Sequence, residues 1–247
     1  MTFDGDASAP IWTPTGDRLI FGRPTGHFWT SPLFSVVVDA TSGIEPLTTE
    51  GHHNPHALTP DGRELIFTAV DHNGLGDIPA LKLGPRALTQ AVVQTDQDEG
   101  RGGVALSLDG RWLAYTSDAT GREEVWVRSY PTTGTPRRIS TNGGREPVWS
   151  RDRRELFYLE GDTMMSVSVK AQSALGLEPP RPLFAQRYAG RRGQPPSYDV
   201  AQDGRFLMIK SSRGPGSAWP SSDLAWRYGS ATGPRPTVSM KSAIARQ

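Results

Sequence analysis

The sequence contains no cysteine among its 247 residues. That absence excludes disulfide bonds, thiolate nucleophiles and zinc sites with cysteine ligands. The chain also lacks any apolar run near the roughly 20 residues that a membrane-spanning helix needs. Neither sign of charge is in excess, because 27 basic residues stand against 26 acidic ones. We therefore expect no membrane insertion and no broad attraction to nucleic acid or anionic lipid.

Signature motifs of several enzyme classes are missing as well. The Gly-x-Ser-x-Gly elbow that carries the nucleophile of α/β hydrolases does not occur. Neither do a Walker loop, a Gly-x-Gly-x-x-Gly phosphate cradle, or the His-Arg-Asp and Asp-Phe-Gly motifs of kinases. The sequence thus gives no motif for acyl transfer, nucleotide binding or phosphoryl transfer.

The chain is rich in glycine (27) and proline (21), which together occupy about a fifth of all positions, against a usual share of about 12%. They interrupt the chain every few residues, which argues against a helical bundle. The first ten residues have no basic region followed by an apolar one, so no secretory signal is expected. We predict a turn-rich, all-β protein. Its compartment stays open: cytoplasmic as given, periplasmic if cut from a longer protein.

One turn sequence recurs five times, at intervals of 46, 48, 43 and 51 residues. Its turn position is occupied by Gly16, Gly62, Gly110, Arg153 and Gly204. A leucine stands three residues later in every copy: Leu19, Leu65, Leu113, Leu156 and Leu207. In the copy Thr59–Gly62, proline presets φ at the second turn position and glycine accepts a left-handed conformation. Each copy therefore predicts a β-hairpin.

The repeats predict four strands each. The turn is followed by a short apolar run, such as Leu65–Phe67, which is typical of a strand buried on both faces. Third strands are expected at Leu33–Val38, Ile78–Leu83, Glu124–Ser129 and Met164–Val169. Outer fourth strands are expected at Pro46–Thr48, Arg86–Thr89, Arg137–Thr141 and Arg181–Phe184. Such a unit is the four-stranded antiparallel blade of a β-propeller. A β-sandwich also has many short strands, but it does not repeat one four-strand unit.

The pattern Ser/Thr-Pro-Asp-Gly-Arg-x-Leu-x-Tyr resembles the WD40-like (PD40-type), TolB-like repeat of bacterial β-propellers. The similarity covers about residues 8–210. Its best part, Leu106–Val169, looks most like the propellers that follow some bacterial serine/threonine kinase domains. The resemblance implies a scaffold motif without catalytic content. Such propellers close with six or more blades, whereas five repeats are visible, so we expect a partial or divergent propeller.

The chain departs from this family pattern at two turns and at its C-terminal end. Thr15 replaces the aspartate of the first turn and Arg153 the glycine of the fourth, which predicts looser turns. We assign residues 1–210 to the propeller repeats. Residues 211–247 are predicted to be a degenerate last blade or an irregular Ser/Gly/Pro-rich tail, with Leu224–Trp226 as the only strand nucleus.

The densest group of chemically competent side chains is the segment that contains His52, His53 and His56. Imidazoles bind divalent transition metals, so this segment is a candidate metal site. However, the spacing matches no helical His-x-x-x-His motif, and neighbours on an extended strand point to opposite faces. The favoured prediction is exposed or channel-lining histidines, with no metal and no cofactor.

The loops before the innermost strands are the predicted functional surface, because in a propeller they gather at one mouth of the central channel. The candidate ligand-binding residues there are His52, His53, His56, Arg101, Arg145 and Glu146. Together with Arg191 and Arg192, they suggest a shallow basic mouth for an acidic ligand or peptide. The alternative is a general bias, since 23 of the 27 basic residues are arginine.

Two other groups receive structural interpretations. Aromatic residues at fixed repeat positions are expected to pack between blades: Trp12, Phe21, Phe67, Tyr115, Trp149 and Tyr158. The acidic run Asp96–Glu99 lacks the glycine and the distal glutamate of a calcium loop, so it is expected to be a solvated loop.

Three functional hypotheses follow. The first is a non-catalytic interaction or sensor module that binds a protein or peptide partner, and the resemblance suggests detachment from a serine/threonine kinase. The second is a metal-assisted lyase or lactonase, which requires His52, His53, His56 and a carboxylate to converge within about 5 Å. The third is a partial gene product without a function of its own. We expect a monomer unless another chain completes the propeller.

Overall fold

The computed structural model describes residues 7–25, 30–39, 43–85, 87–131, 134–171, 175–185, 196–210 and 225–230. These residues form strands, turns and loops, without an α-helix. Within the same ranges, no helix has the length and apolar character needed to cross a bilayer.

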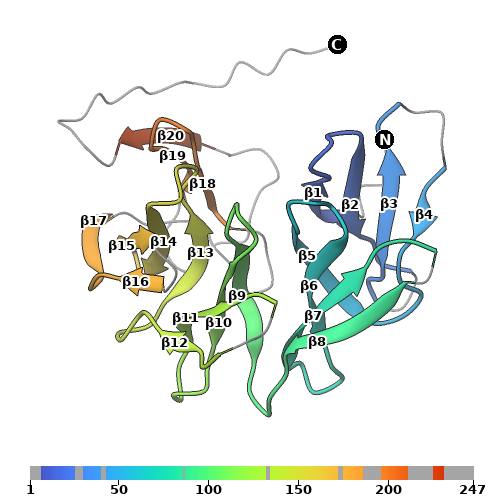
Figure 1. The fold of residues 1–247 in the computed structure, drawn as a ribbon, viewed down its shortest axis with the longest axis horizontal. Coiled ribbons are helices and arrows are strands. Elements are labelled where there is room, and N and C mark those ends of the chain that lie inside the picture. Colours follow the sequence, from blue (N-terminus) through green and yellow to red (C-terminus); the bar gives the residue numbers. More distant parts are fainter. Residues whose placement is uncertain are drawn as a thin grey trace.

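The strands form five antiparallel sheets that follow one another in chain order (Figure 1). The first sheet contains β1 (Ser8–Trp12), β2 (Arg18–Gly22), β3 (Leu33–Val37) and β4 (Glu45–Pro46). The second contains β5 (His52–Leu58), β6 (Glu64–Val70), β7 (Gly76–Lys82) and β8 (Leu88–Val93). The third contains β9 (Glu99–Leu106), β10 (Trp112–Ser117), β11 (Glu124–Ser129) and β12 (Arg137–Arg138).

The last two sheets depart from the four-strand pattern. The fourth contains β13 (Arg145–Trp149), β14 (Glu155–Glu160), β15 (Thr163–Ala171), β16 (Leu175–Leu177) and β17 (Arg181–Ala185), and both β16 and β17 pair with β15. The fifth contains β18 (Tyr198–Val200), β19 (Arg205–Lys210) and β20 (Ala225–Ser230). The backbone of β20 thus takes the third-strand position of the fifth repeat, while the domain boundary at residue 210 stays a prediction.

In the first four sheets, the innermost strand packs against the innermost strand of the next: β1 against β5, β5 against β9, and β9 against β13. Successive meander sheets arranged in this way are the blades of a β-propeller, as Figure 1 shows. The predicted all-β propeller, partial or divergent, is therefore confirmed. Between the fifth sheet and the first, the described strands make no extensive contact.

Local hydrogen bonds explain why the repeated turn sequence makes hairpins. The Thr59 hydroxyl donates to Asp61 Oδ1 (2.6 Å) and accepts from the N–H of Glu64 (3.0 Å). Ser107 and Ser150 make the same pair of bonds in the third and fourth sheets. A side chain of this kind satisfies backbone groups that the turn leaves unpaired.

The two divergent turns keep this geometry. The N–H groups of Gly16 and Arg153 each bond the carbonyl three residues back, at 2.9 and 3.0 Å. In the first turn Asp17 accepts from Thr13 (2.9 Å), which replaces the missing aspartate at position 15. In the fourth turn Arg153 adopts φ of 63°, a left-handed conformation that glycine adopts without steric cost. The looser turns expected from the sequence are not found.

Most of the repeated aromatic residues fill the spaces between sheets. Phe21, Phe67, Tyr115 and Tyr158 are at most 3% exposed. Trp149 is also buried, and its indole N–H donates to the carbonyl of Ala105 in the preceding sheet (3.1 Å). Trp12 contradicts the prediction, because it is 56% exposed. It belongs to the first sheet, which no earlier sheet in the chain covers.

Candidate functional site

The innermost strands of the first four sheets are irregular, and in β5 the irregularity involves a predicted site residue. Register shifts that indicate β-bulges occur in the first four of them: β1, β5, β9 and β13. A bulge adds one residue to a strand and redirects its side chain. In β5 the shift falls between Pro55 and Ala57, so His56 is the extra residue.

A cavity of about 280 Å³ occupies the channel. The innermost strands of all five sheets contribute to its wall, and most of the lining residues are apolar, such as Ile11, Leu106 and Val148. Polar exceptions include His56 and a pair at one side, Arg151 and Asp199, whose Nη2 and Oδ2 atoms lie 3.5 Å apart. This composition suits the burial of apolar groups.

The three predicted histidines of β5 have separate surroundings. His53 Nδ1 shares a hydrogen bond with the Thr48 hydroxyl (3.0 Å), and its ring packs edge-on against Phe67. His52 lies close enough to Arg101, on β9 of the third sheet, for that cation to lower its pKa, after the larger effect of burial. The rings of His52 and His53 therefore lie toward different neighbouring sheets.

Burial keeps two of these histidines neutral at pH 7. His56 Nε2 shares a hydrogen bond with Thr68 Oγ1 (2.7 Å), and desolvation lowers the His56 pKa to about 4. Desolvation, with a smaller effect from His52, also lowers the His53 pKa to about 4. In the described part of the chain, no three His, Asp or Glu side chains are arranged to hold a metal ion.

The predicted arginines are engaged in local contacts. The Arg101 guanidinium donates to the carbonyl of Gly74, and its Nη1 lies 3.9 Å from Asp98 Oδ2. Arg145 donates to Glu146 Oε1 (2.6 Å) and to the carbonyl of Gly161 (3.3 Å). Arg191 and Arg192 lie outside the described residues, so the basic mouth for an acidic ligand stays a prediction.

Glu146 joins the fourth sheet to the fifth. Its side chain is buried, and Oε2 accepts from both the N–H (2.6 Å) and the hydroxyl (2.7 Å) of Ser197. The Tyr198 hydroxyl donates to the carbonyl of Glu146 (2.7 Å). Desolvation and the neighbouring Glu146 charge raise the Tyr198 pKa well above its usual value, which keeps the phenol protonated as a donor. This geometry assigns Glu146 to inter-sheet contact.

The acidic run Asp96–Glu99, which leads into β9, is not the solvated loop that the sequence predicts. Asp96 is exposed, but Asp98 and Glu99 are 6% and 1% exposed rather than solvated. Asp98 fastens the loop to two sheets, because Oδ1 accepts from the Gly76 N–H and its own N–H donates to Asp118, each at 2.9 Å. The glycines that follow the run, Gly100, Gly102 and Gly103, were the sequence signal for close packing of this segment. A Cβ on Gly100 would lie 2.7 Å from Thr68 Oγ1, so this backbone must approach its neighbours closely.

Comparison with known proteins identifies the fold. No protein-family model matches the chain, and no curated protein matches its sequence. Solved structures do match: TolB from Acinetobacter baumannii (15% identity, TM-score 0.63), a puromycin-hydrolyzing peptidase from Mycobacterium tuberculosis (20%, 0.65) and a gluconolactonase from Xanthomonas campestris (11%, 0.61). The matches cover 92%, 94% and 92% of this chain, respectively.

The same matches cover 52%, 37% and 73% of the three other chains, so this chain spans about half the length of the TolB structure. At these identities the similarity establishes a TolB-like propeller fold. Two of the three proteins are named as enzymes and one is not, and a shared fold does not transfer a function. The function of this chain therefore depends on the residues at its site.

Proposed function

We propose that this chain is a non-catalytic, TolB-like β-propeller that binds a protein or peptide partner at its central channel. The observation that carries this proposal is the apolar channel cavity, which continues into exposed apolar side chains. Leu108 lines the cavity and is 48% exposed. Trp12 is 56% exposed and occupies the repeat position of Leu106 and Trp149, which both line the cavity.

Exposed apolar side chains beside an apolar hollow are typical of protein interaction sites. Four prolines contribute to the wall: Pro10, Pro55 and Pro147 from three innermost strands, and Pro196 just before β18. Because proline has no N–H and a fixed φ, these segments offer a preformed surface with few polar groups to desolvate. A partner segment that inserts an apolar side chain into the cavity would cover Leu108.

The lining of the cavity does not favour catalysis. A general base works best with a pKa near the operating pH, whereas His56 has a pKa of about 4 and is bonded to Thr68. The metal-assisted lyase or lactonase has no set of three ligands among the described residues. Its remaining support is the fold shared with a gluconolactonase, which is an analogy.

Association with a serine/threonine kinase stays a prediction from the repeat sequence. Sequencing the gene upstream of the segment that encodes this chain tests the association. An in-frame kinase domain there would support it, and any other neighbouring domain would contradict it.

The channel proposal is tested by selecting peptides from a random displayed library on the immobilised protein. We expect selected peptides to contain apolar residues and to bind the Leu108→Glu and Trp12→Ser variants at least about tenfold more weakly. The matched control is Leu88→Glu, which changes a 64% exposed leucine on the outer strand β8. Equal loss of binding in the control, or no loss at Leu108, would contradict the channel site.

A further inference from the structure

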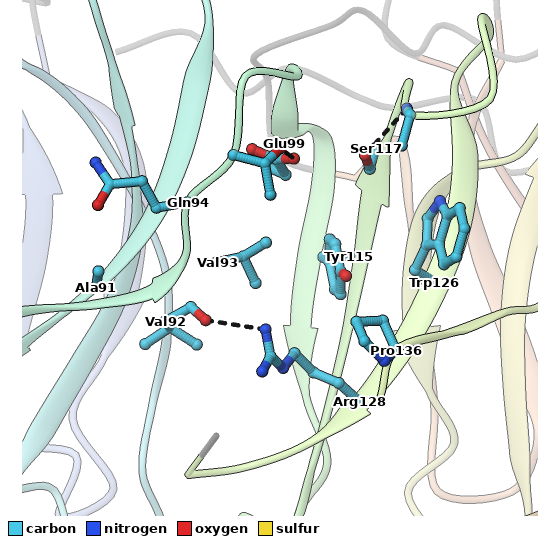
Figure 2. Close-up of a pocket in the computed structure, with 12 residues that line it drawn as sticks. Ala91, Val92, Val93, Gln94, Glu99, Tyr115, Ser117, Trp126, Arg128 and Pro136 are labelled. Atoms are coloured by element: carbon cyan, nitrogen blue, oxygen red, sulfur yellow. Dashed lines mark hydrogen bonds between the residues drawn. The ribbon is translucent and has the colours of Figure 1, made fainter. Parts of the chain in front are cut away.

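A second and larger pocket, of about 460 Å³, lies between the outer strand of the second sheet and the third sheet (Figure 2). Val92 and Val93 at the end of β8 form one wall. Tyr115 from β10 and Trp126 from β11 form the opposite wall. Nothing in the channel proposal uses this pocket.

Three residues around the pocket each leave a buried polar atom without a hydrogen-bond partner in the described part of the chain: Glu99 Oε2, Trp126 Nε1 and Arg128 Nε. The rest of Glu99 is engaged, because Oε1 accepts from the Thr95 hydroxyl. Arg128 donates from Nη1 to the carbonyl of Val92 (3.1 Å), the contact drawn in Figure 2. Buried polar groups are nearly always paired, so three unpaired atoms around one cavity require an explanation.

The pocket has an acidic end and a basic end. Burial raises the Glu99 pKa, the hydrogen bond from Thr95 opposes this effect, and the nearby charges of Asp77, Asp118 and Asp98 add smaller increases. Figure 2 shows the Arg128 cation at the opposite end of the pocket from Glu99, and the two charges act on the Tyr115 pKa in opposite directions. Burial dominates and brings the Tyr115 pKa to about 12, so this phenol stays neutral between the two charges.

We propose that this pocket binds a small zwitterion, namely an amino acid or a short peptide with free ends. Its ammonium group would pair with Glu99 at one end of the pocket, and its carboxylate would accept from Arg128 Nε at the other. An ion pair with hydrogen bonds on both sides is the arrangement that buried charges require. The apolar walls, Val92, Val93 and Pro136, suit a ligand with an apolar side chain.

The route into the pocket is short. Ala91 and Ala119 line it and are exposed. The three unpaired atoms are covered in the unliganded protein, so a ligand reaches them through side-chain rotation, which commonly accompanies binding. Because Ala91 lies at the opening, its replacement by a large residue blocks the pocket without removing any buried group.

Calorimetric titration with four probes tests the ligand class: leucine, the dipeptide Ala-Leu, N-acetyl-Ala-Leu and Ala-Leu amide. We expect saturable binding of leucine or Ala-Leu, and at least about tenfold weaker binding when either end of the dipeptide is blocked. Stronger binding of leucine assigns a free amino acid, and stronger binding of Ala-Leu assigns a peptide. Absence of binding by all probes at about 10 mM, or equal binding of the blocked dipeptides, overturns the proposal.

Two variants test whether the ligand binds in this pocket. Glu99→Gln should weaken Ala-Leu at least about tenfold and abolish the preference for a free amino end. Ala91→Trp should abolish binding, while the matched control Gln90→Trp, on the same strand but outside the pocket, should not. Leu108→Glu, in the channel, should also leave this binding unchanged, so the two sites can fail separately. Binding that persists in Ala91→Trp places the ligand elsewhere and overturns the proposal.

Discussion

Glu146 and Glu99 stand near the start of innermost strands and are 2% and 1% exposed. Both oxygens of Glu146 have strong donors, from Arg145 and from Ser197 in the next sheet. Among the described residues, Glu99 has a donor for one oxygen only, and it lies beside a cavity. At the junction between the fourth and fifth sheets, the buried carboxylate therefore has donors for both oxygens, whereas at the junction between the second and third it keeps one covered oxygen without a donor among the described residues.

This difference shows that burial alone does not distinguish a structural carboxylate from one that binds a ligand. A buried carboxylate pays a large desolvation cost, which a full set of partners offsets. Where the set is complete, the residue is explained by stability. Where the set is half complete and a cavity adjoins it, ligand binding becomes the better explanation. Replacing each glutamate should therefore affect different properties of the protein.

The largest effect is expected for Glu146→Ala. The change leaves Arg145 and the Ser197 N–H without their shared acceptor, and breaking a buried ion pair costs about 3 kcal/mol of unfolding free energy or more. Urea unfolding would measure the loss. A variant as stable as the original protein would show that the two junctions do not differ.

The buried histidines of β5, His53 and His56, predict a pH dependence of stability opposite in sign to that of Glu99. The His56 pKa is about 4 in the folded protein against about 6.5 unfolded, so the unfolded chain binds more protons between these values. The contribution of His56 to the unfolding free energy is therefore complete above pH 6.5 and is lost as the pH falls. At pH 5 the loss is about 2 kcal/mol. Glu99 acts in the other direction, because its raised pKa costs stability as pH rises.

Urea unfolding at pH 7.5 and pH 5 separates these contributions. His56→Gln should remove about 2 kcal/mol of the pH dependence and leave the share of His53 in place. Unchanged pH dependence in this variant would contradict the burial of a neutral His56.

A smaller effect is expected for Ser197→Ala. The hydroxyl bond to Glu146 is lost while the backbone N–H bond remains, and one such hydrogen bond contributes about 1 kcal/mol. Combining Ser197→Ala with Glu146→Ala should then give less than the sum of the two losses, because the residues share one interaction. Additive losses in this double-mutant cycle would contradict direct coupling.

The smallest effect on stability is expected for Glu99→Gln. The amide removes a poorly compensated charge and still accepts from Thr95. The unfolding free energy should therefore either fall by less than about 0.5 kcal/mol or rise. Thermal unfolding without ligand checks this. A loss as large as that of Glu146→Ala would make Glu99 a structural residue and equate the two junctions.

The fold was predictable because its signal is local and repeated. Thr59, Asp61 and Gly62 form their turn through bonds within five residues, and five copies of that turn mark the start of each hairpin. The left-handed φ of Arg153 also fits this account, since the surrounding repeat imposes the turn on a residue that does not favour it.

The sites were less predictable because their partners are distant in sequence. Glu146 was predicted as a ligand-binding residue, yet its main partner Ser197 is 51 residues away and meets it across two sheets. The exposure of Trp12 depends on which sheet covers the first one, and no local pattern encodes that. The pocket beside Glu99 requires β8 to end against β10 and β11, a relation between sheets that the repeat does not specify.

The most direct measurement follows the seven indole N–H resonances of the ¹⁵N-labelled protein during titration with Ala-Leu, with Trp126→Phe identifying the Trp126 signal. If the pocket between the second and third sheets is a ligand site, the Trp126 resonance moves saturably with Ala-Leu. It stays in place with N-acetyl-Ala-Leu amide, the dipeptide blocked at both ends. In Glu99→Gln the movement should require at least about tenfold more Ala-Leu. A Trp126 resonance that does not move, or that moves equally with the blocked dipeptide, would contradict the account.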